Sequence, residues 1–342
     1  MQYITSDNVT ACNKKLLCEL QPESTLVSKR YPFRVTNYYA GLVREPNDSI
    51  WKQCMPDALE LEDLSQCPDP LEEKSLSPVP GLIHRYPDRV VLLVSNRCPV
   101  YCRFCMRKRI VGSGDAPMRE DELHIALDYI AAHPEIHDVI LSGGDPLMLD
   151  DGSLTIILSG LRAIKHVKII RIGTRIPVTF PERITQNLCS LLKEFHPLYI
   201  NTHFNHPSEI TGYSSHACSL LADAGIQLGN QTVLLKGVND SVETMRELMT
   251  GLLAIRVKPY YLHQMDLVKG TAHFRTRVST GLDIMRGLRG HISGLAVPHY
   301  VIDLPGGKGK VAILPDDVEI HGTTLLLRTY TGEQVAYEDI NE

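Results

Sequence analysis

The feature that most constrains the fold is an alternation that begins near Arg89, in which apolar runs of strand length are separated by amphipathic stretches. The strand-length runs are Val90–Ser95, Asp138–Ser142, Val167–Ile172, Leu198–His203, Ile226–Leu235, Lys258–Gln264 and Tyr300–Asp303. The amphipathic stretches lie near residues 121–132, 153–164, 182–194, 215–224, 242–254 and 277–289. Strands that alternate with helices pair in parallel through crossover helices, so the fold class is α/β. Because no nucleotide-binding fingerprint follows any strand, the repeated units predict a partial or complete (β/α) barrel.

The two ends of the chain differ from this regular part. Residues 1–80 are rich in proline and keep no sustained apolar period, which predicts an irregular, partly helical N-terminal extension that wraps a core at 81–314. Residues 315–342 are expected to form a C-terminal tail. No apolar run approaches the roughly 20 residues of a membrane helix, and residues 1–7 lack a signal-peptide pattern.

Charge and cysteine content narrow the class of protein further. The net charge of −5 provides no global attraction to nucleic acid or to an anionic membrane, so neither is expected as a partner. Nine cysteines in 342 residues are too few for a disulfide scaffold. We therefore expect a cytoplasmic protein with reduced thiols.

Three of the cysteines stand close together and indicate a metal centre. Cys98, Cys102 and Cys105 follow the first strand in the spacing C-x3-C-x2-C, which lets three thiolates converge from one loop. A zinc site normally has a fourth Cys or His nearby, and none is in reach by sequence. A four-iron cube held by three cysteines leaves one iron free to chelate a small molecule. The triplet favours such a cluster, and a noncatalytic metal-binding module is the alternative.

The triplet, with Phe104 before its last cysteine, resembles the signature of the radical S-adenosylmethionine superfamily. The segment Ser142-Gly143-Gly144-Asp145, which follows the second strand, resembles the glycine-rich motif of the same superfamily. The resemblance implies a 4Fe–4S cluster on the three cysteines and S-adenosylmethionine at the open iron. It also implies a complete or partial (β/α) barrel of the radical S-adenosylmethionine type.

A glycine-rich segment after the last strand indicates a second cofactor. It reads Asp303-Leu304-Pro305-Gly306-Gly307-Lys308-Gly309-Lys310, where the glycines allow close backbone approach and a lysine follows. Lysine amines form Schiff bases with aldehydes, above all with pyridoxal phosphate. A surface turn with two solvated lysines is the alternative. Upstream of the cysteine loop, Arg85, Tyr86 and Arg89 supply side chains that can hold a phosphate.

From about Tyr31 to about Leu314 these segments together resemble the lysine 2,3-aminomutase family. The resemblance implies that Lys310 is the Schiff-base lysine and that Arg85, Tyr86 and Arg89 contact pyridoxal phosphate. The implied contacts of S-adenosylmethionine are Ser142, Gly143, Gly144, Asp145, His203 and Gln231. The implied contacts of the substrate are Arg107 for the α-carboxylate and Asp266 and Asp303 for a distal ammonium.

This resemblance implies an isomerase, an intramolecular aminotransferase that interconverts L-lysine and L-β-lysine. Hydrogen abstraction by an adenosyl radical would be followed by a 1,2-amino migration assisted by pyridoxal phosphate. The two aspartates favour lysine over glutamate, because a buried ammonium needs compensating charge. The alternative substrate is a protein-bound or other lysine-like group, as in the β-lysylation of elongation factor P.

The resemblance also implies a reducing electron donor such as flavodoxin or ferredoxin, and a homo-oligomer. Better-known members of the family carry a longer C-terminal tail with zinc-binding cysteines. Because no cysteine follows Cys218 here, zinc is not expected. His263 stands where the family often has tyrosine near the cofactor, so contacts with the pyridoxal ring are expected to differ there.

Overall fold

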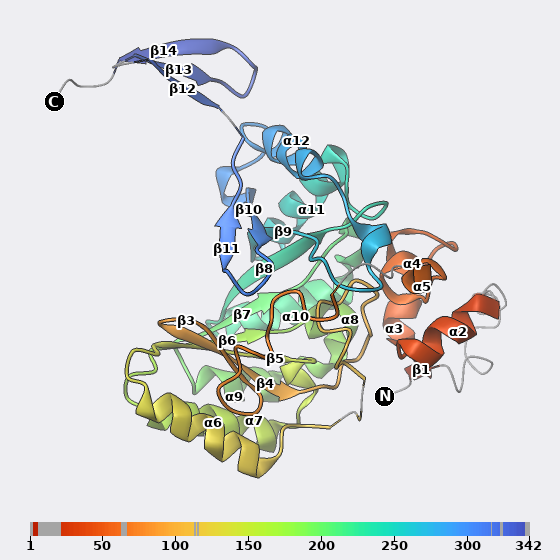
Figure 1. The fold of residues 1–342 in the computed structure, drawn as a ribbon, viewed down its shortest axis with the longest axis vertical. Coiled ribbons are helices and arrows are strands. Elements are labelled where there is room, and N and C mark those ends of the chain that lie inside the picture. Colours follow the sequence, from red (N-terminus) through yellow and green to blue (C-terminus); the bar gives the residue numbers. More distant parts are fainter. Residues whose placement is uncertain are drawn as a thin grey trace.

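The computed structural model describes residues 3–5, 22–62, 67–112, 114, 116–315, 317–321 and 324–338. Its centre is a nine-stranded sheet with the strand order β11-β10-β9-β8-β7-β6-β5-β4-β3. The strands from β4 to β10 pair in parallel, and β3 and β11 pair antiparallel at the two edges. The sheet curls into an open arc (Figure 1). The predicted partial (β/α) barrel is confirmed.

The parallel strands agree with the predicted strand runs to within a few residues. They are β4 (Arg89–Ser95), β5 (Asp138–Gly143), β6 (Ile169–Gly173), β7 (Leu198–Thr202), β8 (Gln227–Leu234), β9 (Val257–Gln264) and β10 (His299–Asp303). The edge strands β3 (Leu82–Tyr86) and β11 (Lys310–Ala312) are additions, since short runs that contain charged residues give no strand signal.

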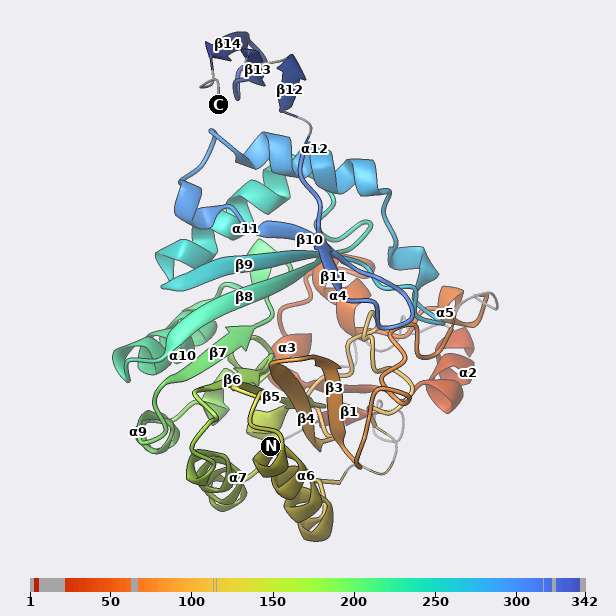
Figure 2. The same ribbon diagram turned by 60° about the vertical axis from the view of Figure 1, so that its left-hand side comes forward.

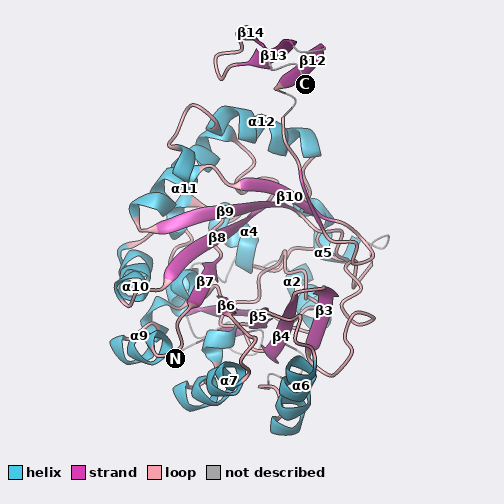
Figure 3. Cartoon of the chain, turned by 90° about the vertical axis from the view of Figure 1, so that its left-hand side faces the viewer, coloured by secondary structure: helices cyan, strands magenta, loops and turns pink. Residues whose placement is uncertain are grey.

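Crossover helices cover the convex face of the arc, as Figure 3 shows. They are α6 (Glu120–Ala132), α7 (Asp151–Ala163), α9 (Gln186–Lys193), α10 (Gly212–Asp223), α11 (Val242–Ala254) and α12 (Val278–Leu288). Shorter turns of helix are α8 (Ile176–Thr179), η1 (Pro146–Met148), η2 (Pro181–Arg183), η3 (Pro207–Glu209), η4 (Ala272–Phe274) and η5 (Gly294–Ala296). In α7, Leu154, Leu158 and Leu161 are buried at helical spacing, so one apolar stripe packs each helix onto the sheet.

The N-terminal extension is partly helical, as predicted, and its helices lie beside the loops that follow the parallel strands (Figure 1). It contains β1 (Tyr3–Thr5), α2 (Pro22–Arg30), β2 (Arg34–Thr36), α3 (Asn37–Ala40), α4 (Ser49–Cys54) and α5 (Leu59–Glu62). Residues 1–2, 6–21 and 63–66 of the predicted extension lie outside the described residues. The extension contacts the cysteine loop directly, since the amides of Tyr101 and Arg103 donate to the carbonyls of Arg34 and Gln53, both at 2.9 Å.

The C-terminal residues form a separate antiparallel sheet of β12 (Val318–His321), β13 (Thr324–Arg328) and β14 (Gln334–Glu338). This sheet lies apart from the central sheet in two views (Figures 1 and 2) and contacts the residues after α12, where the rings of Tyr330 and His291 are 5.5 Å apart. These three strands are not predicted from the sequence. The division of the chain after residues 80 and 314 stays a prediction. In the part of the chain that is described, no helix is long and apolar enough to cross a membrane.

Alternation along the parallel strands separates the core from the interior of the barrel. Leu92, Leu141, Ile172 and Ile200 are fully buried and point toward the helices. The intervening positions face the interior and are partly exposed, and several of them are polar: Ser142, Asn201, Gln231 and His263. A polar interior at the carboxyl ends of the strands is where a barrel of this kind places its chemistry.

Candidate active site

The three clustered cysteines lie on the loop after β4, and each is partly exposed. Desolvation raises the pKa of the Cys105 thiol to about 11, and the nearby Cys102 adds to this shift. Within the described residues, no three His, Cys, Asp or Glu side chains are gathered around one ion position. A four-iron cube takes each cysteine on a different iron, so three spaced thiols on one loop fit a cluster better than a single ion.

A buried charge network anchors the cysteine loop to the N-terminal extension. Arg103, between two of the cysteines, is 1% exposed and donates to Glu60 Oε2 at 2.6 Å and to the carbonyl of Pro32 at 2.9 Å. Lys108 Nζ lies 2.5 Å from the same Glu60 oxygen. Burial lowers the pKa of Lys108 to about 8 despite that carboxylate. The network fixes the loop because removing any one charge would leave the others buried and unpaired.

The glycine pair after β5 is needed for close packing against the approach to the cysteine loop. Gly143 has φ +120°, and a Cβ on it would lie 2.2 Å from the carbonyl oxygen of Ser95. A Cβ on Gly144 would lie 2.4 Å from the carbonyl oxygen of Arg97. The Gly144 amide donates to Ser95 O at 2.5 Å. Only glycine allows this approach, so the motif couples β5 to the segment that carries Cys98.

Asp145 is turned into the protein rather than toward the barrel interior. Its carboxylate accepts hydrogen bonds from Thr174 Oγ1 and from the Arg175 amide, both at 2.7 Å, and from the Leu147 amide at 3.1 Å. Burial raises its pKa to about 6 against these hydrogen bonds. The structure therefore places Asp145 as the link between the loops after β5 and β6.

His203 and Gln231 lie at the interior end of β7 and on β8. The ring of His203 sits 5.6 Å from the ring of Phe104 in the cysteine loop, and its buried Nε2 has no hydrogen-bond partner in the described residues. Burial lowers the pKa of His203 well below its usual value, and Arg175 lowers it further. A neutral imidazole with an unmet nitrogen, next to the cysteine loop, fits a polar ligand at this position.

Arg107 is held from two sides. Its Nε and Nη2 donate to Glu73 Oε1 at 3.0 and 2.8 Å, and its Nη1 donates to Ser142 Oγ at 3.0 Å. Glu73 also accepts from Arg109 at 2.8 Å. Burial opposes ionisation of Glu73, but the two arginines keep its pKa below the usual value. A guanidinium has five N–H donors, so one N–H on each terminal nitrogen of Arg107 stays available for a ligand.

A second group of charged residues connects the two edges of the open sheet at Asp303 on β10. Lys310 Nζ on β11 lies 2.5 Å from Asp303 Oδ2, and Arg85 Nη2 on β3 lies 2.7 Å from Oδ1. His263 Nδ1 on β9 lies 3.3 Å from Oδ2. Burial opposes ionisation of Asp303, but His263 and Lys310 hold its pKa well below the usual range. Asp303 is thus an anion surrounded by three donors from different strands.

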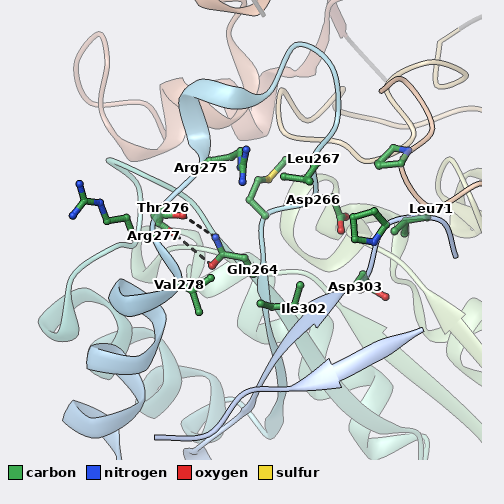
Figure 4. Close-up of a pocket in the computed structure, with 13 residues that line it drawn as sticks. Leu71, Gln264, Asp266, Leu267, Arg275, Thr276, Arg277, Val278, Ile302 and Asp303 are labelled. Carbon is green, nitrogen blue, oxygen red and sulfur yellow. Dashed lines mark hydrogen bonds between the residues drawn. The ribbon is translucent and has the colours of Figure 1, made fainter. Parts of the chain in front are cut away.

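Asp266, after β9, has no hydrogen bond or ion pair to its side chain in the described residues. It lines a cavity of about 440 Å³ together with Asp303, Leu71 and Gln264, as Figure 4 shows. Desolvation raises the pKa of Asp266 to about 7, and the negative charge of Asp303 contributes to the shift. A carboxyl group that titrates near neutrality in a cavity, with no protein partner, is suited to bind a cation.

The structure distinguishes the two lysines of the glycine-rich segment. Lys310 points to Asp303, whereas Lys308 is exposed. Gly307 has φ +67°, and a Cβ there would lie 2.5 Å from Leu76 Cδ1, so the segment packs closely against the loop before β3. Gly309 approaches Tyr86, whose hydroxyl would be 3.6 Å from a Cβ at that position.

Arg85 and Arg89 flank the ring of Tyr86, with guanidinium carbons 5.2 and 4.9 Å from its centre. Arg89 also pairs with Asp88 at 2.9 Å, and the buried Nε of Arg85 has no partner in the described residues. Two cationic groups beside a lysine that can form a Schiff base fit a phosphorylated aldehyde. The predicted residues Arg85, Tyr86, Asp303 and Lys310 therefore do come together.

Two residues at the site, Glu73 and Arg175, are not predicted from the sequence. Glu73 fixes Arg107, and Arg175 contacts Cys102. Arg175 lies two residues after the end of β6, so the rule that chemistry gathers at strand ends would have found it. Glu73 lies in an irregular segment and carries no such signal.

Comparisons with known proteins agree with this geometry. The model of the radical SAM superfamily matches residues 92–249, and the lysine-2,3-aminomutase model matches residues 285–342. The L-lysine 2,3-aminomutase of Clostridium subterminale is 50% identical over 89% of this chain and 74% of its own length. A putative L-lysine 2,3-aminomutase of Aquifex aeolicus is 48% identical over 95% of this chain and 90% of its own. The glutamate 2,3-aminomutase of Clostridioides difficile is 45% identical over 92% and 75%.

Proposed function

The chain belongs to the lysine 2,3-aminomutase family of radical S-adenosylmethionine enzymes, and on that premise we propose that it interconverts L-lysine and L-β-lysine. It is an isomerase that uses a 4Fe–4S cluster, S-adenosylmethionine and pyridoxal phosphate. The relatives include a glutamate enzyme, so overall identity alone does not select the substrate. The observation that supports lysine as the substrate is that Asp266, which has no partner in the described residues, lines one cavity with Asp303.

For the cluster, we propose that Cys98, Cys102 and Cys105 are the ligands. When bound, the cluster and S-adenosylmethionine supply a carbon radical that abstracts hydrogen, and pyridoxal phosphate supplies the π system for the amino migration. The protein holds the cysteine loop through Arg103, and the close packing of Gly144 against Arg97 fixes the segment that leads into that loop. His203 and Gln231 line the same space and would orient S-adenosylmethionine.

At the other end, we propose that Lys310 carries pyridoxal phosphate while Arg85, Tyr86 and Arg89 contact it. The substrate-free structure shows the Lys310 amine paired with Asp303 at 2.5 Å. Asp303, which pairs with the Lys310 amine, would hold that ammonium whenever Lys310 is not joined to the cofactor. We propose that the same carboxylate also contributes to recognition of the distal ammonium of the substrate.

For the substrate, we propose that Arg107 holds the α-carboxylate through its two free N–H groups, while Glu73 and Ser142 fix the plane of the guanidinium. Asp266 then accepts the ε-ammonium, which replaces the missing protein partner. Both ends of lysine are thereby fixed, so the β-carbon is held in one place between the cysteine loop and Lys310.

The proposal is tested by anaerobic incubation of the reconstituted enzyme with S-adenosylmethionine, pyridoxal phosphate, dithionite and one substrate at a time. Mass spectrometry after derivatisation should show β-lysine from L-lysine and no β-glutamate from L-glutamate. Product from lysyl-modified elongation factor P, with none from free lysine, would instead establish the protein-bound substrate. Borohydride reduction should attach pyridoxal phosphate to Lys310; a label on the exposed Lys308 would refute the assigned lysine.

Finer properties also remain proposals. Family membership implies a small-molecule substrate and a reductant, and we propose flavodoxin or ferredoxin as the electron donor. We propose a homo-oligomer and a cytoplasmic location, the latter because all cysteines in the described residues are free. Size-exclusion chromatography with light scattering tests the first of these two.

A further inference from the structure

Arg175 makes a contact that the proposed reaction does not use. Its Nη1 lies 2.7 Å from Cys102 Sγ, whereas the carbonyl of Val100 lies 4.0 Å from the same sulfur. The guanidinium also lies over the ring of Phe104, with its central carbon 5.3 Å from the ring centre. Arg175 is 7% exposed, so water screens this contact very little.

The rest of the guanidinium is fixed in place by a buried set of acceptors. Its Nη2 donates to Gln53 Oε1 at 2.6 Å, to Glu209 Oε1 at 2.7 Å and to Tyr39 Oη at 3.0 Å. Its Nε donates to the carbonyl of His203 at 3.1 Å. Every acceptor comes from a different element, so Nη1 cannot turn away from Cys102 without breaking several buried hydrogen bonds.

The charge of this group bears on the electron that starts the reaction. Reduction by dithionite adds one electron to the cluster and raises the negative charge on its iron and sulfur atoms by one. A donor to a cluster sulfur, and a cation beside it, stabilise the reduced form more than the oxidised form, and hydrogen bonds to the sulfurs are known to set cluster potentials. Glu209 offsets the charge of Arg175 but binds Nη2, whereas the sulfur is bound by Nη1.

We propose that Arg175 acts through Cys102 to raise the reduction potential of the cluster, and that Glu209 moderates this effect. The inference rests on the cluster site of the proposed function, but it is independent of the substrate. It assigns opposite signs to two variants. Removing the arginine together with its counter-ion should lower the potential, whereas removing the counter-ion alone should raise it.

The test is a redox titration of the reconstituted enzyme followed by electron paramagnetic resonance, without substrate. The double variant R175Q/E209Q avoids leaving a buried anion unpaired. At a fixed potential its ratio of reduced to oxidised cluster should be about tenfold below that of E209Q, a difference of about 59 mV for one electron. Arg183→Gln, which removes an arginine that pairs with Asp151 at 2.6 Å, should leave the potential unchanged.

The outcomes separate a tuning role from a merely structural one. A structural role would change iron content or melting temperature while the clusters that do load keep the wild-type potential, and that result would overturn the inference. A wild-type enzyme that binds no iron would overturn the proposed function as well. If R175Q/E209Q fails to load, wild-type enzyme with ¹⁵N-guanidinium arginine decides the matter: a ¹⁵N hyperfine coupling in the reduced spectrum supports the contact, and its absence excludes it.

Discussion

The two ends of the barrel interior are built from the same kinds of charged residues but treat them in opposite ways. Around the cysteine loop, each buried charge is paired: Arg103 and Lys108 with Glu60, and Arg175 with Glu209. Around Lys310, charges are crowded onto Asp303, while Asp266 has no partner in the described residues. At the cysteine loop the protein pairs these buried charges by itself, whereas near Lys310 the Asp266 carboxyl is left for a ligand.

The difference corresponds to what each end has to do. A loop that carries a cluster must keep its shape in every step, and the paired buried charges hold it in that shape. A pocket that binds one amine after another needs an anion that can change partners, which is Asp303. It also needs a second acidic group that is free to bind the substrate, which is Asp266. A buried carboxyl without a partner therefore marks the substrate pocket, and paired buried charges mark the scaffold that holds the cysteine loop.

The largest effect is expected when the buried charge network that anchors the cysteine loop is broken. Glu60→Gln leaves Arg103 and Lys108 buried without their carboxylate, and breaking a buried pair in this way costs about 3–5 kcal/mol. Urea denaturation of the cofactor-free protein should show a loss of that order. Glu62→Gln, an exposed change on the same helix α5, is the matched control and should change the unfolding free energy by less than about 0.5 kcal/mol. Equal effects of the two variants would show that the network does not stabilise the fold.

The next largest effect is expected from a substitution of Asp303, in the pocket near Lys310. Asp303→Asn removes the anion shared by Arg85, Lys310 and His263, and one charged hydrogen bond is worth about 1.5–3 kcal/mol. We expect kcat/KM for lysine to fall about 100-fold and the iron content to stay unchanged. Because Asp303 contacts Lys310, the labelling of Lys310 by pyridoxal phosphate should also weaken in this variant. A variant with full labelling and full activity would contradict the shared role of Asp303.

A smaller effect is the pH dependence of lysine binding. The pKa of Asp266 is raised to about 7 in the empty site, so below that pH the carboxyl must lose a proton before it can pair with an ammonium. The Kd of lysine, measured by calorimetry, should therefore be about tenfold larger at pH 6 than at pH 8. Asp266→Asn should bind more weakly and remove this slope. A wild-type Kd that is flat across the range would mean that Asp266 does not meet the substrate.

The same raised pKa makes the folded protein without ligand less stable at high pH, where lysine binding is stronger. Because the folded state binds the Asp266 proton more tightly than the unfolded chain, stability of the empty protein is lost as pH rises from about 4 to about 7. Asp266→Asn should thus raise the melting temperature of the cofactor-free protein at pH 8 and have little effect at pH 4. A lower melting temperature at pH 8 would show that the carboxylate has a partner after all.

Much of the fold could be predicted from the sequence because periodicity and burial coincide in the regular part. The runs that became β4 to β10 are apolar on the helix-facing side, and their crossover helices carry one apolar stripe each. The edge strand β11 could not be predicted in this way, since its three residues begin with Lys310 and are stabilised only by pairing with β10. The C-terminal sheet, from Val318 to Glu338, was likewise missed, because its exposed strands lack a clear one-sided pattern.

Site residues were predictable where a motif or a strand end marked them. Lys310, Asp303 and Arg85 come together as expected, although they lie far apart along the chain. The sequence could not show that Asp145 turns into the scaffold, since a carboxylate after a glycine pair has no intrinsic direction. Nor could it show that Glu73 reaches Arg107, because that contact depends on how an irregular segment packs.

We infer above all that Asp266 and Asp303 recognise a distal ammonium. The most direct test compares L-lysine with L-norleucine, which lacks the ε-amino group. The measurement is the ratio of kcat/KM for the two compounds in wild type and in Asp266→Asn. We expect wild type to favour lysine by about 100-fold or more and the variant to lose at least about tenfold of that preference, as the worth of charged hydrogen bonds predicts. A wild-type enzyme that accepts norleucine as readily as lysine would contradict the assignment of Asp266 and Asp303 to the substrate.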